Sequence, residues 1–107
     1  MDKKALRQAR AKIVQERSRI VGPLEKKVGE LEASIEKLEA ESAAALKALE
    51  AASVAGNGNA IAEHSRNHDR LEAAIEAAFE ALEPASAEFE AAAGEFDHRL
   101  DELAGDG

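Results

Sequence analysis

The chain has 107 residues, no cysteine, three aromatic residues and a formal net charge of −8. So few large side chains cannot build a sizeable globular core, and the lack of cysteine excludes disulfides, thiol catalysis and thiolate metal sites. No apolar run approaches the length of a membrane span. The basic start is not followed by the apolar run that a secretory signal requires, so we expect a cytoplasmic protein.

The first predicted element is a basic helix over residues 2–21. The first thirty residues hold nine Lys/Arg against four acidic residues, whereas the remainder holds five against eighteen. Leu6, Ala9, Ile13 and Ile20 mark one apolar face, and the cations mostly occupy the other faces. A net-acidic chain therefore begins with a basic limb.

Gly22-Pro23 is expected to introduce a kink or a short break into this helix. Proline cannot donate to the preceding turn, and its ring disfavours helical geometry in the residue before it. Proline also suits the first position of a helix, and we expect a new, long helix over residues 23–53. The apolar spacing runs four and four from Ile20 to Val28, so we expect the heptad phase to change here.

The long helix carries a heptad seam, because apolar or small residues recur in alternating steps of four and three. Such a seam forms a narrow stripe that another helix must cover. Residues 54–59 then interrupt the pattern with Gly and Asn, which tolerate a left-handed backbone. The helix is therefore predicted to form half of a coiled coil whose partner follows a turn. The seam residues are Leu24, Val28, Leu31, Ile35, Leu38, Ser42, Ala45, Leu49 and Ala52.

A second seam follows the turn and alternates in the same steps. We expect a return helix over residues 60–83, a break near Pro84 and a C-terminal helical segment over residues 84–104. A turn centred near Asn57 makes the numbers of facing residues sum to roughly 113 and places one seam against the other. The second seam comprises Ile61, His64, His68, Leu71, Ile75, Ala78, Leu82, Ala85, Phe89, Ala92 and Phe96.

The predicted fold is all-α. Residues 1–107 form a single coiled-coil domain, an antiparallel helical hairpin that is an intramolecular two-stranded coiled coil, with breaks near Pro23 and Pro84. The Ala-rich seam gives modest burial for each layer, so the sequence leaves homodimer formation open.

His64 and His68 stand four residues apart, the spacing at which two imidazoles on one helix face can share a metal. Glu63, Asp69 or Glu72 is available as a third ligand, but the chain has no cysteine and no third histidine nearby. We therefore expect no metal. The pair is interpreted as a polar layer that sets the register, with Ser42 within reach.

No catalytic constellation is present, and the carboxylates lie in Glu-rich runs on solvated helix faces, so we expect no enzymatic activity. The basic limb suits electrostatic contact with a phosphate backbone, but its cations are also placed to neutralise the acidic C-terminal segment. The second interpretation makes the chain a structural or protein-interaction hairpin without nucleic-acid contact.

The order of segments along the chain resembles a known domain. A basic helix is followed by GPLEKKVGELEASIEKLEAE at residues 22–41, a short loop and a return helix with LEAAIEAAFEALE at residues 71–83. The domain that this order resembles is the C-terminal coiled-coil domain of the ABC-F subfamily of ATP-binding-cassette ATPases, including its Uup-like members. The family's step of Pro-Leu followed by two basic residues is matched by Pro23, Leu24, Lys26 and Lys27. The family's usual Trp near the end of the return helix is replaced by Phe79.

The resemblance implies a C-terminal appendage of a cytoplasmic twin-cassette ATPase. No Walker motif occurs here, so this chain holds no cofactor, and ATP would be bound by the cassettes of the parent protein. The family association implies ribosomal RNA, transfer RNA or DNA as partners, together with the parent's ATPase cassettes and no membrane. The residues expected to anchor the nucleic-acid backbone are Lys3, Lys4, Arg7, Arg10, Lys12, Arg17, Arg19, Lys26 and Lys27.

Overall fold

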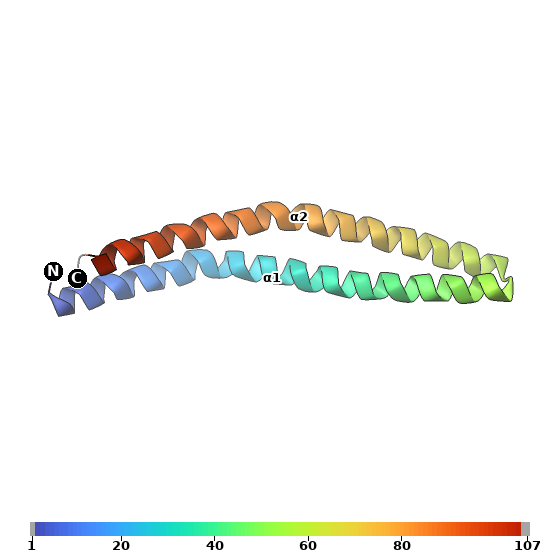
Figure 1. Ribbon diagram of the computed structural model, residues 1–107, viewed down its shortest axis with the longest axis horizontal. Coiled ribbons are helices and arrows are strands. Elements are labelled where there is room, and N and C mark those ends of the chain that lie inside the picture. The colour runs from blue at the N-terminus through green and yellow to red at the C-terminus, as the bar shows by residue number, and fades with distance from the viewer. Residues whose placement is uncertain (1, 106–107) are drawn as a thin grey trace. The chain divides into compact units, whose positions relative to one another are not determined.

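The computed structural model describes residues 2–105, and within them the chain forms two helices and no strand (Figure 1). Helix α1 comprises Lys3–Ala55 and helix α2 comprises Gly58–Gly105. The two helices run antiparallel and are joined by a tight turn, so the predicted antiparallel helical hairpin is confirmed.

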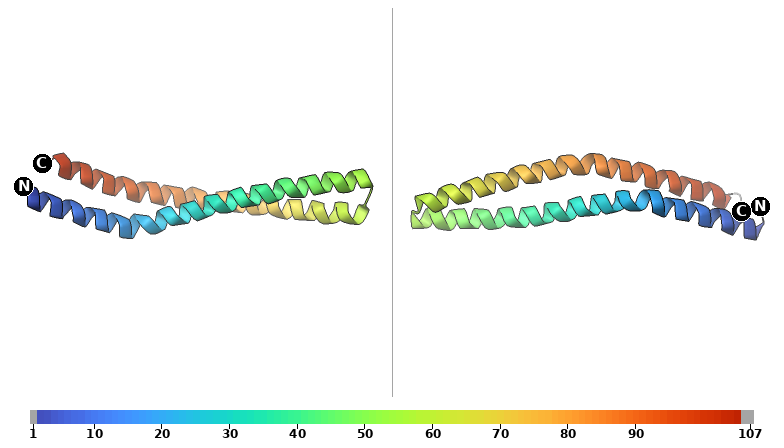
Figure 2. Two further views of the ribbon diagram at one scale, coloured as in Figure 1. Left: turned by 90° about the horizontal axis from the view of Figure 1, so that it is seen from below. Right: turned by 180° about the vertical axis from the view of Figure 1, so that it is seen from behind.

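The hairpin consists of two compact units. Unit 1 comprises residues 1–29 and 83–107, and unit 2 comprises residues 30–82. In unit 1 the N-terminal part of α1 packs along the C-terminal part of α2, while unit 2 contains the turn and the remainder of both helices (Figure 2).

The turn between the helices is shorter than the predicted residues 54–59. Only Gly56 and Asn57 separate α1 from α2, and Gly56 has a positive φ of 68°. The Gly56 N–H donates to the Ser53 carbonyl (3.2 Å) and the Asn57 N–H donates to the Ala52 carbonyl (3.1 Å). These two bonds form the Schellman motif, in which a left-handed glycine ends a helix.

Asn57 also caps the start of α2. Its side-chain Oδ1 accepts a hydrogen bond from the Ala60 N–H (3.2 Å), and its carbonyl accepts one from the Ile61 N–H (2.9 Å). A side-chain acceptor at this position satisfies a donor that the first helical turn leaves unpaired. One residue therefore completes the end of one helix and the start of the next.

Both predicted seams form the contact between the helices. Every predicted seam residue from Leu24 to Ala52 and from Ile61 to Phe96 is buried or half-buried. The buried apolar core residues are Val21, Ala85 and Phe96 in unit 1, and Ile35, Ala45, Ala52 and Leu71 in unit 2.

The predicted register is also close to the observed one. Side-chain contacts join Ser42 with Glu72 in unit 2, and Arg17 with Asp97 in unit 1. The residue numbers of both pairs sum to one more than predicted. A two-residue turn fixes how the chain folds back, so facing positions follow by counting outward from it.

The predicted helix breaks near Pro23 and Pro84 require correction, because both prolines lie inside continuous helices. The predicted helix limits at residues 21, 23, 83 and 84 are therefore not helix ends. Proline removes one backbone hydrogen bond from a helix interior and crowds the preceding turn. Both prolines are solvent-exposed, and the neighbouring Val21 and Ala85 are buried in the seam, so burial on the inner face offsets the local cost.

The predicted apolar face of the basic limb also requires correction at its C-terminal end, where Val21 rather than Ile20 is buried. Leu6, Ala9 and Ile13 are half-buried as predicted, but Ile20 is 36% exposed, whereas Val21 is only 1% exposed. The steps of four therefore run from Ile13 to Val21, before the proline rather than across it.

Candidate nucleic-acid interface

The nine cations named as backbone anchors lie on the N-terminal part of α1, within unit 1. Arg17 is half-buried and the other eight are exposed. An exposed charged side chain can contact a partner without any rearrangement of the fold. The exposed residues are Lys3, Lys4, Arg7, Arg10, Lys12, Arg19, Lys26 and Lys27.

Arg17 is the cation of this group that pairs with the acidic C-terminal segment. Its Nε lies 3.4 Å from Oδ1 of Asp97 on α2. A second bridge between the helices has the opposite polarity, because Arg99 on α2 places Nη1 3.7 Å from Oε2 of Glu16. The same guanidinium contacts Glu95 at 2.8 Å and stacks over the Phe96 ring with 4.8 Å to its centroid.

Seven of the nine cations make no ion pair with any other residue in the described range 2–105. Lys26 does take part in a further interaction, so it is not counted with them. The acidic C-terminal segment therefore neutralises Arg17 but leaves most of the basic limb facing solvent. The seven are Lys3, Lys4, Arg7, Arg10, Lys12, Arg19 and Lys27.

Three of these cations, Lys4, Lys12 and Arg19, lie within about 80° of one another around the axis of α1, at 100° per residue. They follow one another at about 11 Å along the helix axis. Lys4 lies opposite the seam, whereas Lys12 and Arg19 lie closer to its edge and line a hollow together with Glu16. Glu16 is itself paired with Arg99 of α2.

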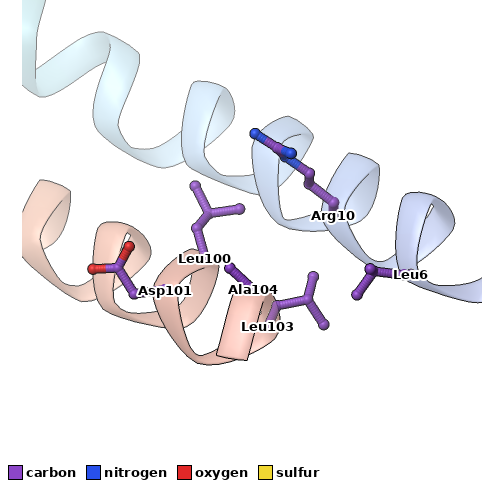
Figure 3. Close-up of a pocket in the computed structure, with 6 residues that line it drawn as sticks. All are labelled: Leu6, Arg10, Leu100, Asp101, Leu103 and Ala104. Atoms are coloured by element: carbon purple, nitrogen blue, oxygen red, sulfur yellow. The ribbon is translucent and has the colours of Figure 1, made fainter. Parts of the chain in front are cut away.

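Arg10 has a different environment from these three cations. It lines a hollow of about 190 Å³ in unit 1, between the ends of α1 and α2 (Figure 3). Leu6 and Leu100 give this hollow an apolar lining, while Arg10 and Asp101 introduce opposite charges from the two helices. Periodicity alone did not reveal the hollow, because it depends on how the two helix ends pack.

Part of the predicted polar layer is present in unit 2, where a carboxylate links His68 to Ser42. The Ser42 Oγ donates to Glu72 Oε1 at 2.6 Å, and His68 Nε2 lies 3.5 Å from the same oxygen. Ser42 is 5% exposed, so the hydrogen bond satisfies a hydroxyl removed from water. Glu72 stands four residues after His68, a spacing that could have identified it as the link.

Across residues 2–105, no group of three or more His, Asp or Glu side chains is placed to hold a metal ion. His98 lies on the surface, 72% exposed, with Nε2 3.1 Å from Glu102 Oε1.

Comparisons with known proteins leave the family open. No protein-family model matches the chain, and neither a curated protein nor a solved structure matches it. Within residues 2–105, no helix combines the length and apolar character needed to cross a membrane.

Proposed function

We propose that this chain is a non-catalytic coiled-coil module that binds the backbone of nucleic acid through the exposed cations of its N-terminal limb. The observation that carries the proposal is that seven cations in the N-terminal part of α1 are exposed and make no ion pair within the described residues, Lys4, Lys12 and Arg19 among them. Each cation that meets a phosphate releases condensed counterions, so binding is favourable and salt-dependent without any base contact.

On this proposal the chain belongs to a longer ATPase of the ABC-F type. The supporting features are the order of basic limb, Pro23-Leu24 step, tight turn and return helix along the chain. ATP binding and hydrolysis then reside in the cassettes of that protein, and the hairpin contributes affinity for rRNA, tRNA or DNA.

Fluorescence anisotropy of labelled duplex DNA and structured RNA across a salt series tests the proposal. The test variant carries Lys4→Gln, Lys12→Gln and Arg19→Gln, and we expect its salt dependence to fall by about 3 units of log Kd per log salt concentration. Glutamine keeps good helix propensity, so far-UV circular dichroism is expected to stay unchanged.

The matched control removes three exposed cations from unit 2, through Lys37→Gln, Lys47→Gln and Arg66→Gln. Both variants have the same net charge, so a loss confined to the first locates binding on the basic limb. Equal losses in the two variants, or no binding at low salt, would contradict the proposed interface.

A further inference from the structure

A groove runs along one side of unit 2, between α1 and α2. It consists of two hollows that share Glu39. On α1 its lining extends from Glu32 to Leu46, and on α2 it extends from His68 to Leu82, with residues recurring every three or four positions. That recurrence keeps the lining on one face of each helix. The fourteen residue-to-residue steps from Glu32 to Leu46, at 1.5 Å each, give a groove about 21 Å long.

The floor of the groove exposes large apolar side chains. Phe79 is 49% exposed and Leu46 is 43% exposed, and Ile35 and Ile75 line the groove beside them. Two packed helices cover only one stripe of each other, so apolar groups at the edge of the seam stay in water unless a third element covers them.

The rim of the groove is acidic. Glu32, Glu36, Glu39 and Glu72 line it and are exposed, and no Lys or Arg lines either hollow. Unit 2 as a whole contains eleven acidic residues and four Lys/Arg, a formal charge of −7. A second copy of unit 2 would bring like charges against this rim, whereas a basic partner would neutralise them.

We propose that this groove docks an amphipathic helix of a partner protein, with an apolar face flanked by Lys or Arg. The apolar face would cover Phe79 and Leu46 and complete a three-helix arrangement, the mode in which helices bind to hydrophobic grooves. The flanking cations would lie against the glutamates of the rim and exclude acidic or neutral helices.

The probe is a labelled 18-residue helical peptide with Leu along one face and Lys on both flanks, titrated into the full chain. A matched peptide with Glu in place of every Lys is expected not to bind. Phe79→Ala combined with Leu46→Ala is expected to weaken binding of the Lys peptide at least tenfold, roughly the effect of losing a central interface anchor. The apolar control, Val14→Ala with Val54→Ala, removes exposed side chains outside the groove and is expected to leave binding unchanged.

A pair of charge variants separates docking in the groove from general attraction to an acidic protein. The triple variant Glu32→Gln, Glu36→Gln and Glu39→Gln removes three rim carboxylates. The control Glu41→Gln, Glu63→Gln and Glu80→Gln removes three exposed carboxylates that line neither hollow. Weaker binding in the rim variant than in the control supports docking in the groove.

Equal losses in the rim and control variants would overturn the proposal. It would also be overturned if sedimentation equilibrium showed a dimer that Phe79→Glu converts to a monomer, because a second copy would then cover the groove. The nucleic-acid proposal depends on cations of unit 1, so the two proposals fail independently.

Discussion

At the scale of single residues, Ser42 shows how a polar side chain fits into an otherwise apolar seam. Its hydroxyl is almost fully buried and donates to Glu72, which extends from the edge of the facing helix and remains 55% exposed at its side chain. The carboxylate therefore satisfies the buried hydroxyl while keeping most of its own hydration. A polar layer of this kind favours one register over its neighbours.

We expect Glu72→Ala to lower the free energy of unfolding by about 1 kcal/mol, because the buried Ser42 hydroxyl loses its partner. The matched control is Glu76→Ala, one turn further along α2, which removes an exposed glutamate away from Ser42. Urea denaturation followed by far-UV circular dichroism measures both. Equal unfolding free energies for the two variants would show that the hydrogen bond contributes nothing to stability.

Val21 and Ile20 provide a second comparison at this scale, because adjacent apolar residues differ sharply in burial. Val21→Ala is expected to cost about 2 kcal/mol, since it removes two methyl groups from a packed site. Ile20→Ala removes more atoms but from a partly exposed position, and is expected to cost less. Thermal unfolding compares the two, and the reverse order would place Ile20 in the seam.

At the scale of the helices, α1 and α2 are continuous because packing along the seam outweighs the local cost of each proline. Each proline weakens its own helix, yet the seam continues on both sides of it and only a continuous helix presents every seam residue to the partner. The turn, in contrast, is determined by local hydrogen bonds. Gly56 and Asn57 end one helix and begin the next through backbone bonds and one side chain, with little contribution from packing.

Pro23→Ala is expected to stabilise unit 1, by up to about 3 kcal/mol, because it restores a helical N–H donor and removes a ring that crowds the previous turn. Thermal unfolding by circular dichroism measures the change. Gly94→Ala serves as a reference for helix propensity alone, with an expected gain of at most about 1 kcal/mol, since an added methyl group would contact nothing nearby. A loss of stability in Pro23→Ala would indicate that the proline has a required structural role.

At the scale of the whole molecule, the dominant property is the uneven distribution of charge. Unit 1 holds ten Lys/Arg and eleven acidic residues, whereas unit 2 has a formal charge of −7. Repulsion between carboxylates therefore acts mainly within unit 2. Exposed ion pairs such as Arg17 with Asp97 contribute too little stabilisation to offset this repulsion.

We therefore expect sodium chloride to raise the thermal unfolding midpoint between low and moderate ionic strength, because salt screens like charges on neighbouring turns. The expected gain in the free energy of unfolding is about 1 kcal/mol. Glu32→Gln, Glu36→Gln and Glu39→Gln together are expected to raise the midpoint at low salt and reduce the response to salt. Differential scanning calorimetry measures both effects. A midpoint that falls with salt would show that attractive ion pairs outweigh the repulsion.

The local signals in the sequence were sufficient to predict the hairpin, both seams from Leu24 to Phe96 and the register to within one residue at two contacts. Heptad spacing decides which side chains share a face, and a Gly-Asn turn decides where the chain reverses, so neither requires knowledge of distant residues.

Tertiary packing alone decided that the helices continue through both prolines, that Val21 rather than Ile20 is buried, and that Glu72 is the partner of Ser42. It also decided which cations of the basic limb stay exposed and where a groove opens beside Phe79 and Leu46. Each of these outcomes depends on free energy gained or lost between segments far apart in the chain, and no window of sequence contains both segments.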